Sequence, residues 1–124
     1  MNNEDLEKEI VEKGLTAPRV SLNDLLANIE EIHFFTAEDA THLSRVNSKH
    51  DVQQKVPDCH QSLKLLTFCV IVTKNGFTVT GESACASPEN FNAEMGRKIA
   101  KEQALNKLWP LMGYALKEKL HTEG

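Results

Sequence analysis

The spacing of apolar positions changes along the chain, and each spacing indicates a different element. Leu6, Ile10 and Val11 recur at helical intervals, which predicts a helix from Asp5 to Lys13 that ends at Gly14. A second helix is expected to begin at the capping residue Ser21. Its apolar face would carry Leu22, Leu25, Leu26, Ile29 and Ile32. The aromatic stretch 33–36 is typical of a short edge strand, and residues 36–39 are suited to begin another short helix.

A β-hairpin is the strongest local prediction. Residues 65–73 read as a strand, and Asn75-Gly76 favours a type I′ turn, because both central positions of that turn need positive φ. Pairing Lys74 with Phe77 places Val72 opposite Val79 and Val70 opposite Gly81. The expected core face then carries Phe68, Val70, Val72, Phe77 and Val79. The opposite, half-polar face would carry Thr67, Cys69, Ile71, Thr73, Thr78, Thr80 and Glu82, and would meet solvent or a partner.

A long C-terminal helix follows the hairpin. Ser87-Pro88-Glu89-Asn90 has helix-start chemistry, with proline suited to the first helical position. Pro110 is expected to kink or break the helix, and Gly113-Tyr114 to form a second joint. The predicted buried stripe comprises Phe91, Met95, Ile99, Ala104, Leu105, Leu108 and Trp109.

These elements predict one α+β domain: an antiparallel, hairpin-centred sheet packed by the C-terminal helix. Residues 1–43 would form a helical N-terminal arm, 44–62 a flexible polar loop, and 63–124 the core. A chain of 124 residues can bury only a small core, so oligomerisation would add stability.

Composition narrows the function classes. The net charge of −4 argues against a general nucleic-acid binder, which needs many phosphate contacts, although a small phosphorylated ligand needs only two or three cations. Three irregularly spaced cysteines are not a disulfide framework and agree with a reducing compartment. The longest apolar run, residues 68–72, is too short to cross a bilayer, and residues 1–11 show no signal-peptide pattern. We expect a cytoplasmic protein without membrane contact.

The start of the C-terminal helix is the main candidate site. Free N–H groups at a helix start suit an anion or a polar small molecule. The Asn90 and Asn92 amides can form hydrogen bonds with a base or a ribose, and the Phe91 ring can stack on a base. The cations that can bind phosphates are Arg97, Lys98 and Lys101. The alternative is a capped amphipathic helix whose solvent face happens to be basic.

Other candidates have weaker patterns. One cluster of possible nucleophiles has no recognisable base beside it: Glu82, Ser83, Cys85 and Ser87. The ordinary polar residues of a turn, or a buried thiol, explain this cluster better. Cys59-His60 with His50 or His42 lacks the paired spacing of zinc sites. Trp109 and Tyr114 suit core or subunit-interface anchors better than ligand stackers. The residues therefore favour a binding module with no catalytic set, metal or cofactor.

Two family resemblances bear on function. The strand–strand–helix order resembles double-stranded RNA-binding domains, but their first helix and basic anchor loop are missing and the net charge has the opposite sign. A more specific resemblance is to the small phage family often labelled gene-product 49/66. It rests on ordered motifs over the C-terminal half, with looser similarity at 13–20. The motifs are NGF at 75–77, ESAC at 82–85, PENF at 88–91, EMG at 94–96, NKLW at 106–109 and GY at 113–114.

That resemblance implies a phage or prophage protein in the cytoplasm of a bacterial host. The family is similar to anti-defence proteins that counter Thoeris immunity as oligomeric sponges, which bind cyclic ADP-ribose isomers or cyclic oligonucleotides without degrading them. The implied ligand-binding residues are Asn90, Phe91, Asn92, Arg97, Lys101 and Lys107. Two alternatives remain: an accessory factor that inhibits a host defence enzyme, and a hydrolase of the same signal.

Overall fold

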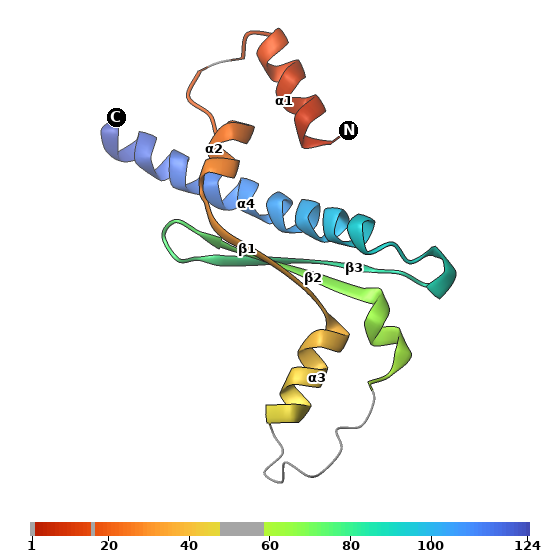
Figure 1. Ribbon diagram of the computed structural model, residues 1–124. Helices are drawn as coiled ribbons and strands as arrows, with labels where there is room; N and C mark the ends of the chain where they lie inside the picture. The colour runs from red at the N-terminus through yellow and green to blue at the C-terminus, as the bar shows by residue number, and fades with distance from the viewer. Residues whose placement is uncertain (1, 16, 48–58) are drawn as a thin grey trace.

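A computed structural model describes residues 2–15, 17–47 and 59–124 and confirms the predicted α+β fold. Three antiparallel strands form one sheet in the order β1–β2–β3, and the long helix α4 packs along one face (Figure 1). The elements are α1 (Asn3–Glu12), α2 (Leu22–Ala27), β1 (Ile29–Thr36), α3 (Ala37–Asn47), β2 (Leu66–Thr73), β3 (Thr78–Ala84) and α4 (Ala93–Glu123). Two short 3-10 turns cover Gln61–Leu65 and Pro88–Asn90.

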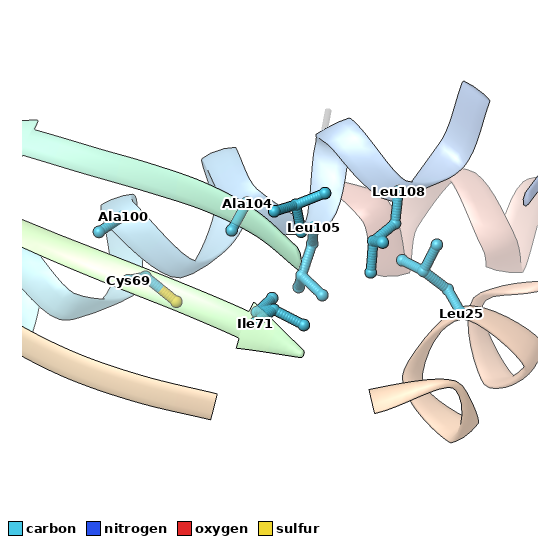
Figure 2. Packing of buried hydrophobic residues seen from close by; sticks show 8 residues of the cluster. Leu25, Cys69, Ile71, Ala100, Ala104, Leu105 and Leu108 are labelled. Atoms are coloured by element: carbon cyan, nitrogen blue, oxygen red, sulfur yellow. The ribbon is translucent and has the colours of Figure 1, made fainter. Parts of the chain in front are cut away.

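Small residues bring α4 close to the sheet. Its buried positions are Gly96, Ala100, Ala104, Leu105 and Leu108. The last four pack in one cluster with Cys69 and Ile71 of β2 (Figure 2). The predicted stripe is therefore right at Ala104, Leu105 and Leu108. It is wrong at Met95 and Ile99, whose side chains are 53% and 47% exposed. The reason is that the first turns of α4 face the strands with Gly96 and Ala100, so the larger side chains beside them point outward.

The close approach depends on Gly81 in β3. A Cβ at this position would overlap the carbonyl oxygen of Ala100 and would lie 2.6 Å from the backbone nitrogen of Ala104. Absence of a side chain at Gly81 thus lets the helix backbone rest directly on the strand.

The hairpin register differs from the prediction by one residue. Ile71 pairs with Val79, and Cys69 pairs with Gly81. The Thr73 N–H donates to the Phe77 carbonyl at 2.8 Å, and the Gly76 N–H donates to the Thr73 carbonyl at 2.9 Å. Only Gly76 has positive φ in this turn, at 86°. The loop therefore holds three residues ending in a left-handed glycine, instead of the two-residue type I′ turn.

That one-residue shift reverses the faces of β2. Thr67, Cys69, Ile71 and Thr73 are buried toward α4, whereas the predicted core residues Phe68, Val70 and Val72 are half-buried on the other face. On β3 the prediction holds at Val79, which is buried, and fails at Phe77, which is 55% exposed at the hairpin tip. Because side chains alternate along a strand, one extra loop residue is enough to invert the assignment.

The second predicted helix is shorter than expected. Ser21 caps α2, as the sequence indicated, and the structure adds a capping box with Asp24. The helix ends at Ala27, and Ile29 and Ile32 belong to β1, so the predicted helical face was wrong at these two positions. β1 extends the expected edge strand to eight residues, within the part of the chain predicted as a helical arm.

Residues 44–62 are not wholly a loop. α3 continues to Asn47, and a 3-10 turn begins at Gln61. Residues 48–58 lie outside the described residues, so the rest of this prediction falls there.

The predicted break at Pro110 was wrong, since α4 continues through Pro110 and Gly113 to Glu123, whereas the alternative of a kink stays a prediction. Pro110 leaves the carbonyl of Asn106 without its helical partner. Both residues are exposed, so water can solvate that carbonyl and the helix need not end.

Candidate functional site

The predicted site lies where the chain leaves β3 and enters α4. The Asn90 N–H donates to the Ser87 carbonyl at 3.0 Å, which closes the 3-10 turn. Asn92 is the N-cap, and its Oδ1 accepts the Met95 N–H at 3.0 Å. Pro88 therefore begins a short turn, and α4 itself begins only at Ala93.

Phe91 separates two small recesses at this helix start. One, about 150 Å³, is lined mainly by the Asn90–Asn92 stretch with Cys85, Met95 and Ile99. The other, about 120 Å³, lies between Phe91, Arg97 and residues of β1 and β2. The structure thus brings together four predicted site residues, Asn90, Phe91, Asn92 and Arg97.

Two polar side chains of this site are available to a ligand. Arg97 and the side chain of Asn90 form no hydrogen bond or ion pair with any residue in the described ranges. Asn92 differs, because its oxygen is already occupied by the helix cap. Asp39 lines the same recess as Arg97, and its carboxylate accepts the Thr36 N–H at 3.0 Å. An anion near Arg97 would therefore also meet this negative charge.

Lys101 and Lys107 do not line the Phe91 recesses, and their predicted role in ligand binding stays a prediction. Lys101 lines a separate cleft of about 500 Å³ between α1, α2 and α4. Lys107 is exposed on α4 and lines neither the recesses nor that cleft. Arg97 and Lys101 are four residues apart and lie on a similar side of α4, so the neighbouring elements separate them. Lys107 is ten residues from Arg97 and projects in a different direction.

Sequence reasoning missed the contribution of β1 and β2 to the second recess. Phe34, Thr36 and Thr67 line it together with Arg97. Phe34 is 37% exposed although it faces the same side of the sheet as α4, because α4 packs mainly on β3 and β2. The two adjacent aromatic residues, Phe34 and Phe35, were the only available sequence signal.

The polar turn residues show no catalytic arrangement in the described part of the chain. Cys85 donates its thiol hydrogen to the Ser87 carbonyl at 3.1 Å, and no described histidine contacts it. His60 Nδ1 lies 2.6 Å from Ser62 Oγ, a local contact at the cap of the 3-10 turn. No carboxylate among the described residues orients that ring, as a nucleophile–base pair would require.

The cysteines divide into one buried and two partly exposed thiols. Burial raises the pKa of the Cys69 thiol, although the nearby Lys101 charge acts in the opposite direction. Cys69 therefore behaves as a small apolar core residue. Among the described residues no group of three or more His, Cys, Asp or Glu side chains is placed to hold a metal ion, and His50 lies outside them.

Trp109 and Tyr114 have different surroundings. Trp109 packs against the core, and its Nε1–H donates to Asn3 Oδ1 at 3.2 Å. Tyr114 is 74% exposed, so it is no core residue of this chain. Its predicted role at a subunit interface stays a prediction.

Comparison with known proteins identifies one family. The model of the phage protein (N4 Gp49/phage Sf6 gene 66) family matches residues 20–120. No curated protein and no protein of solved structure matches the chain. Over the described ranges, none of the helices combines the length and apolar character needed to cross a membrane.

Proposed function

The chain belongs to the N4 Gp49/phage Sf6 gene 66 family of phage proteins, and from this premise we propose that it is an anti-defence protein that sequesters a cyclic nucleotide immune signal. The ligand class is a cyclic ADP-ribose isomer or a cyclic oligonucleotide. The proposed mechanism is burial of the ligand without chemistry, so the protein is not an enzyme.

The observation that carries this proposal is the arrangement around Phe91. At the start of α4 the Phe91 ring lines two recesses, one with the Asn90 amide and the other with the Arg97 guanidinium, and neither of these two polar groups has a partner among the described residues. An aromatic face suits a base, a guanidinium suits a phosphate, and helix N–H groups favour negative charge.

The size of the recesses supports a site completed by a second subunit. Ligand pockets usually enclose about 300–1,000 Å³, and these recesses measure about 150 and 120 Å³. Met95 and Ile99 line the larger recess and are about half exposed. A second copy that covered these two side chains would deepen the recess and bury apolar surface at the same time. We therefore propose a homo-oligomer.

Thermal melting against a panel of cyclic ADP-ribose isomers and cyclic di- and trinucleotides tests the proposal. A ligand at about a hundredfold over its Kd should add roughly 2.7 kcal/mol, a shift of several degrees. The double variant Asn90→Ala/Arg97→Ala should lose the shift and keep the fold. Lys107→Ala is the matched control, because it removes a cation of the same helix outside the recesses. Undiminished binding by the double variant would refute the placement.

The fate of the ligand separates the functional classes. Release of the intact molecule by boiling supports sequestration, whereas its conversion would identify a hydrolase. If no ligand of the panel shifted the Tm while the controls worked, the second candidate would be favoured: an accessory factor that inhibits a host defence enzyme by protein contact. The half-buried apolar side chains Phe68, Val70 and Val72 on the sheet face opposite α4 favour that alternative. The accessory-factor alternative predicts that one host enzyme, and not a small molecule, co-purifies with the protein.

A further inference from the structure

We propose that α1 is a detachable strap that forms one wall of the cleft between α1, α2 and α4, and that polar contacts of Asn3 and Glu7 hold α1 against the domain. The proposal does not depend on the nature of the ligand at Phe91.

The cleft beneath the strap has a mixed lining. Leu22 and Leu26 of α2 and Leu105 of α4 form its apolar part, and Lys98 and Lys101 of α4 form its cationic part. The first residues of α1 complete its wall. With α1 attached, the cleft measures about 500 Å³, which is within the usual range of ligand sites, so detachment of α1 would remove a wall of a site of that size.

Little apolar contact holds α1 in place. The helix contains no buried residue, and Leu6 and Val11 are 45% and 56% exposed. None of the buried residues of the core cluster comes from α1. Hydrophobic burial, the main driving force of folding, therefore contributes little to its attachment.

A single side chain latches the start of α1 onto α4. The Asn3 amide donates to Glu102 Oε1 at 2.6 Å and to Asn106 Oδ1 at 3.2 Å. Its oxygen accepts the indole N–H of Trp109 at 3.2 Å. Because one amide makes all three contacts, releasing Asn3 detaches this end of the helix in one step.

A second contact tethers the helix to the start of α2. Arg19 donates two hydrogen bonds to the Glu7 carboxylate, at 2.8 and 3.2 Å, and the Leu22 N–H donates a third at 3.1 Å. Glu7 lies one helical turn from Asn3, so the latch can open while this tether still holds α1 near the domain.

The domain boundary is consistent with a separable strap. The family match begins at residue 20, after α1, and the core cluster lies wholly within the matched range. Opening α1 thus leaves the core of the family domain intact. It also removes one wall of the cleft, which is lined by Lys101, an exposed residue that forms no hydrogen bond or ion pair with the described residues.

The only tryptophan in the chain reports on the latch. We would compare the full-length protein with Asn3→Ala, and use Asn23→Ala as the matched control. Asn23 is an exposed helical asparagine for which the described structure shows no hydrogen bond. In Asn3→Ala, acrylamide should quench Trp109 fluorescence more strongly, and α1 amides should lose hydrogen-exchange protection by roughly tenfold, while buried α4 amides keep theirs.

Three results would contradict the proposal that α1 is a detachable strap. One is an equal response of Asn3→Ala and Asn23→Ala. Another is α1 protection that matches that of Ala100 and Leu108, which would make α1 part of the global unfolding unit. The third is a gradient of protection that declines smoothly toward residue 2, because simple fraying lacks the common opening step of a strap. Circular dichroism of both variants would confirm that the fold is retained.

Discussion

Replacing Gly81 with alanine tests whether α4 rests directly on β3. The new Cβ would overlap the Ala100 carbonyl oxygen and would lie 2.6 Å from the Ala104 nitrogen and 2.9 Å from the Gln103 Cβ. Two of these three neighbours are backbone atoms, so no side-chain rotation can relieve the overlap. The helix must move away from the sheet.

The expected cost follows from that displacement. Ordinary overpacking of a core costs about 1–3 kcal/mol. A gap of about 0.5–1 Å along the rest of the interface also forfeits a quarter to a half of each dispersion contact. We expect a loss near 3 kcal/mol, out of a total of about 5–15 kcal/mol for a domain of this kind. Since Ile71 and Leu108 pack in the same cluster, the loss should extend along the core.

Urea denaturation and thermal melting, followed by circular dichroism, measure this loss. Gly81→Ala should lower the Tm by roughly 10 °C. Gly113→Ala is the control, because no heavy atom lies within 4 Å of a Cβ at that helical position. It should gain up to about 1 kcal/mol from the better helix propensity of alanine. A Gly81→Ala protein that melts within about 2 °C of the parent would refute the close-contact reasoning.

Further predictions concern the core, acid stability and thiol reactivity. Leu108→Ala should cost about 2–5 kcal/mol in urea denaturation, because the side chain is buried, whereas Leu111→Ala on the exposed side of α4 should cost under about 0.5 kcal/mol. The hydrogen bonds from Arg19 hold the pKa of Glu7 below its usual value. The contribution of ionised Glu7 to stability is therefore present above about pH 4.3 and is lost as the pH falls through the lowered pKa of Glu7. Hydrogen exchange should show that the α1 amides lose protection over that acidic pH range, and Glu7→Gln should abolish this pH dependence. If α1 of the variant lost protection over the same pH range as α1 of the parent, the assignment to Glu7 would be contradicted. Burial raises the pKa of the Cys69 thiol, so Ellman's reagent should titrate two thiols in the folded protein and three in urea; three fast thiols in the folded protein would contradict the buried position.

Local sequence patterns identified most helices and strands because the interactions that begin and end these elements join residues close together in the sequence. The capping box at Ser21 and the turn glycine at Gly76 act within a few residues, and both are present in the structure. The ordered motifs of the C-terminal half also led to the family that the comparison found. Asn90, Phe91 and Asn92 were brought together simply because they are consecutive.

Tertiary structure decided which face of β2 is buried. Both faces of this strand are apolar enough to form a core, with Cys69 and Ile71 on one and Val70 and Val72 on the other. The choice depends on where α4 rests, and α4 rests where Gly81 and its own alanines permit the closest packing. No pattern within β2 contains that information.

Tertiary structure also divided the predicted cations among different sites. Arg97 meets β1 and β2 beside Phe91, whereas Lys101, one turn further, meets the cleft under α1. Sequence spacing places both on a similar side of the helix, but it cannot say which distant segment lies opposite each. Those neighbours are set by packing between segments far apart in the chain, and that packing determined the composition of both sites.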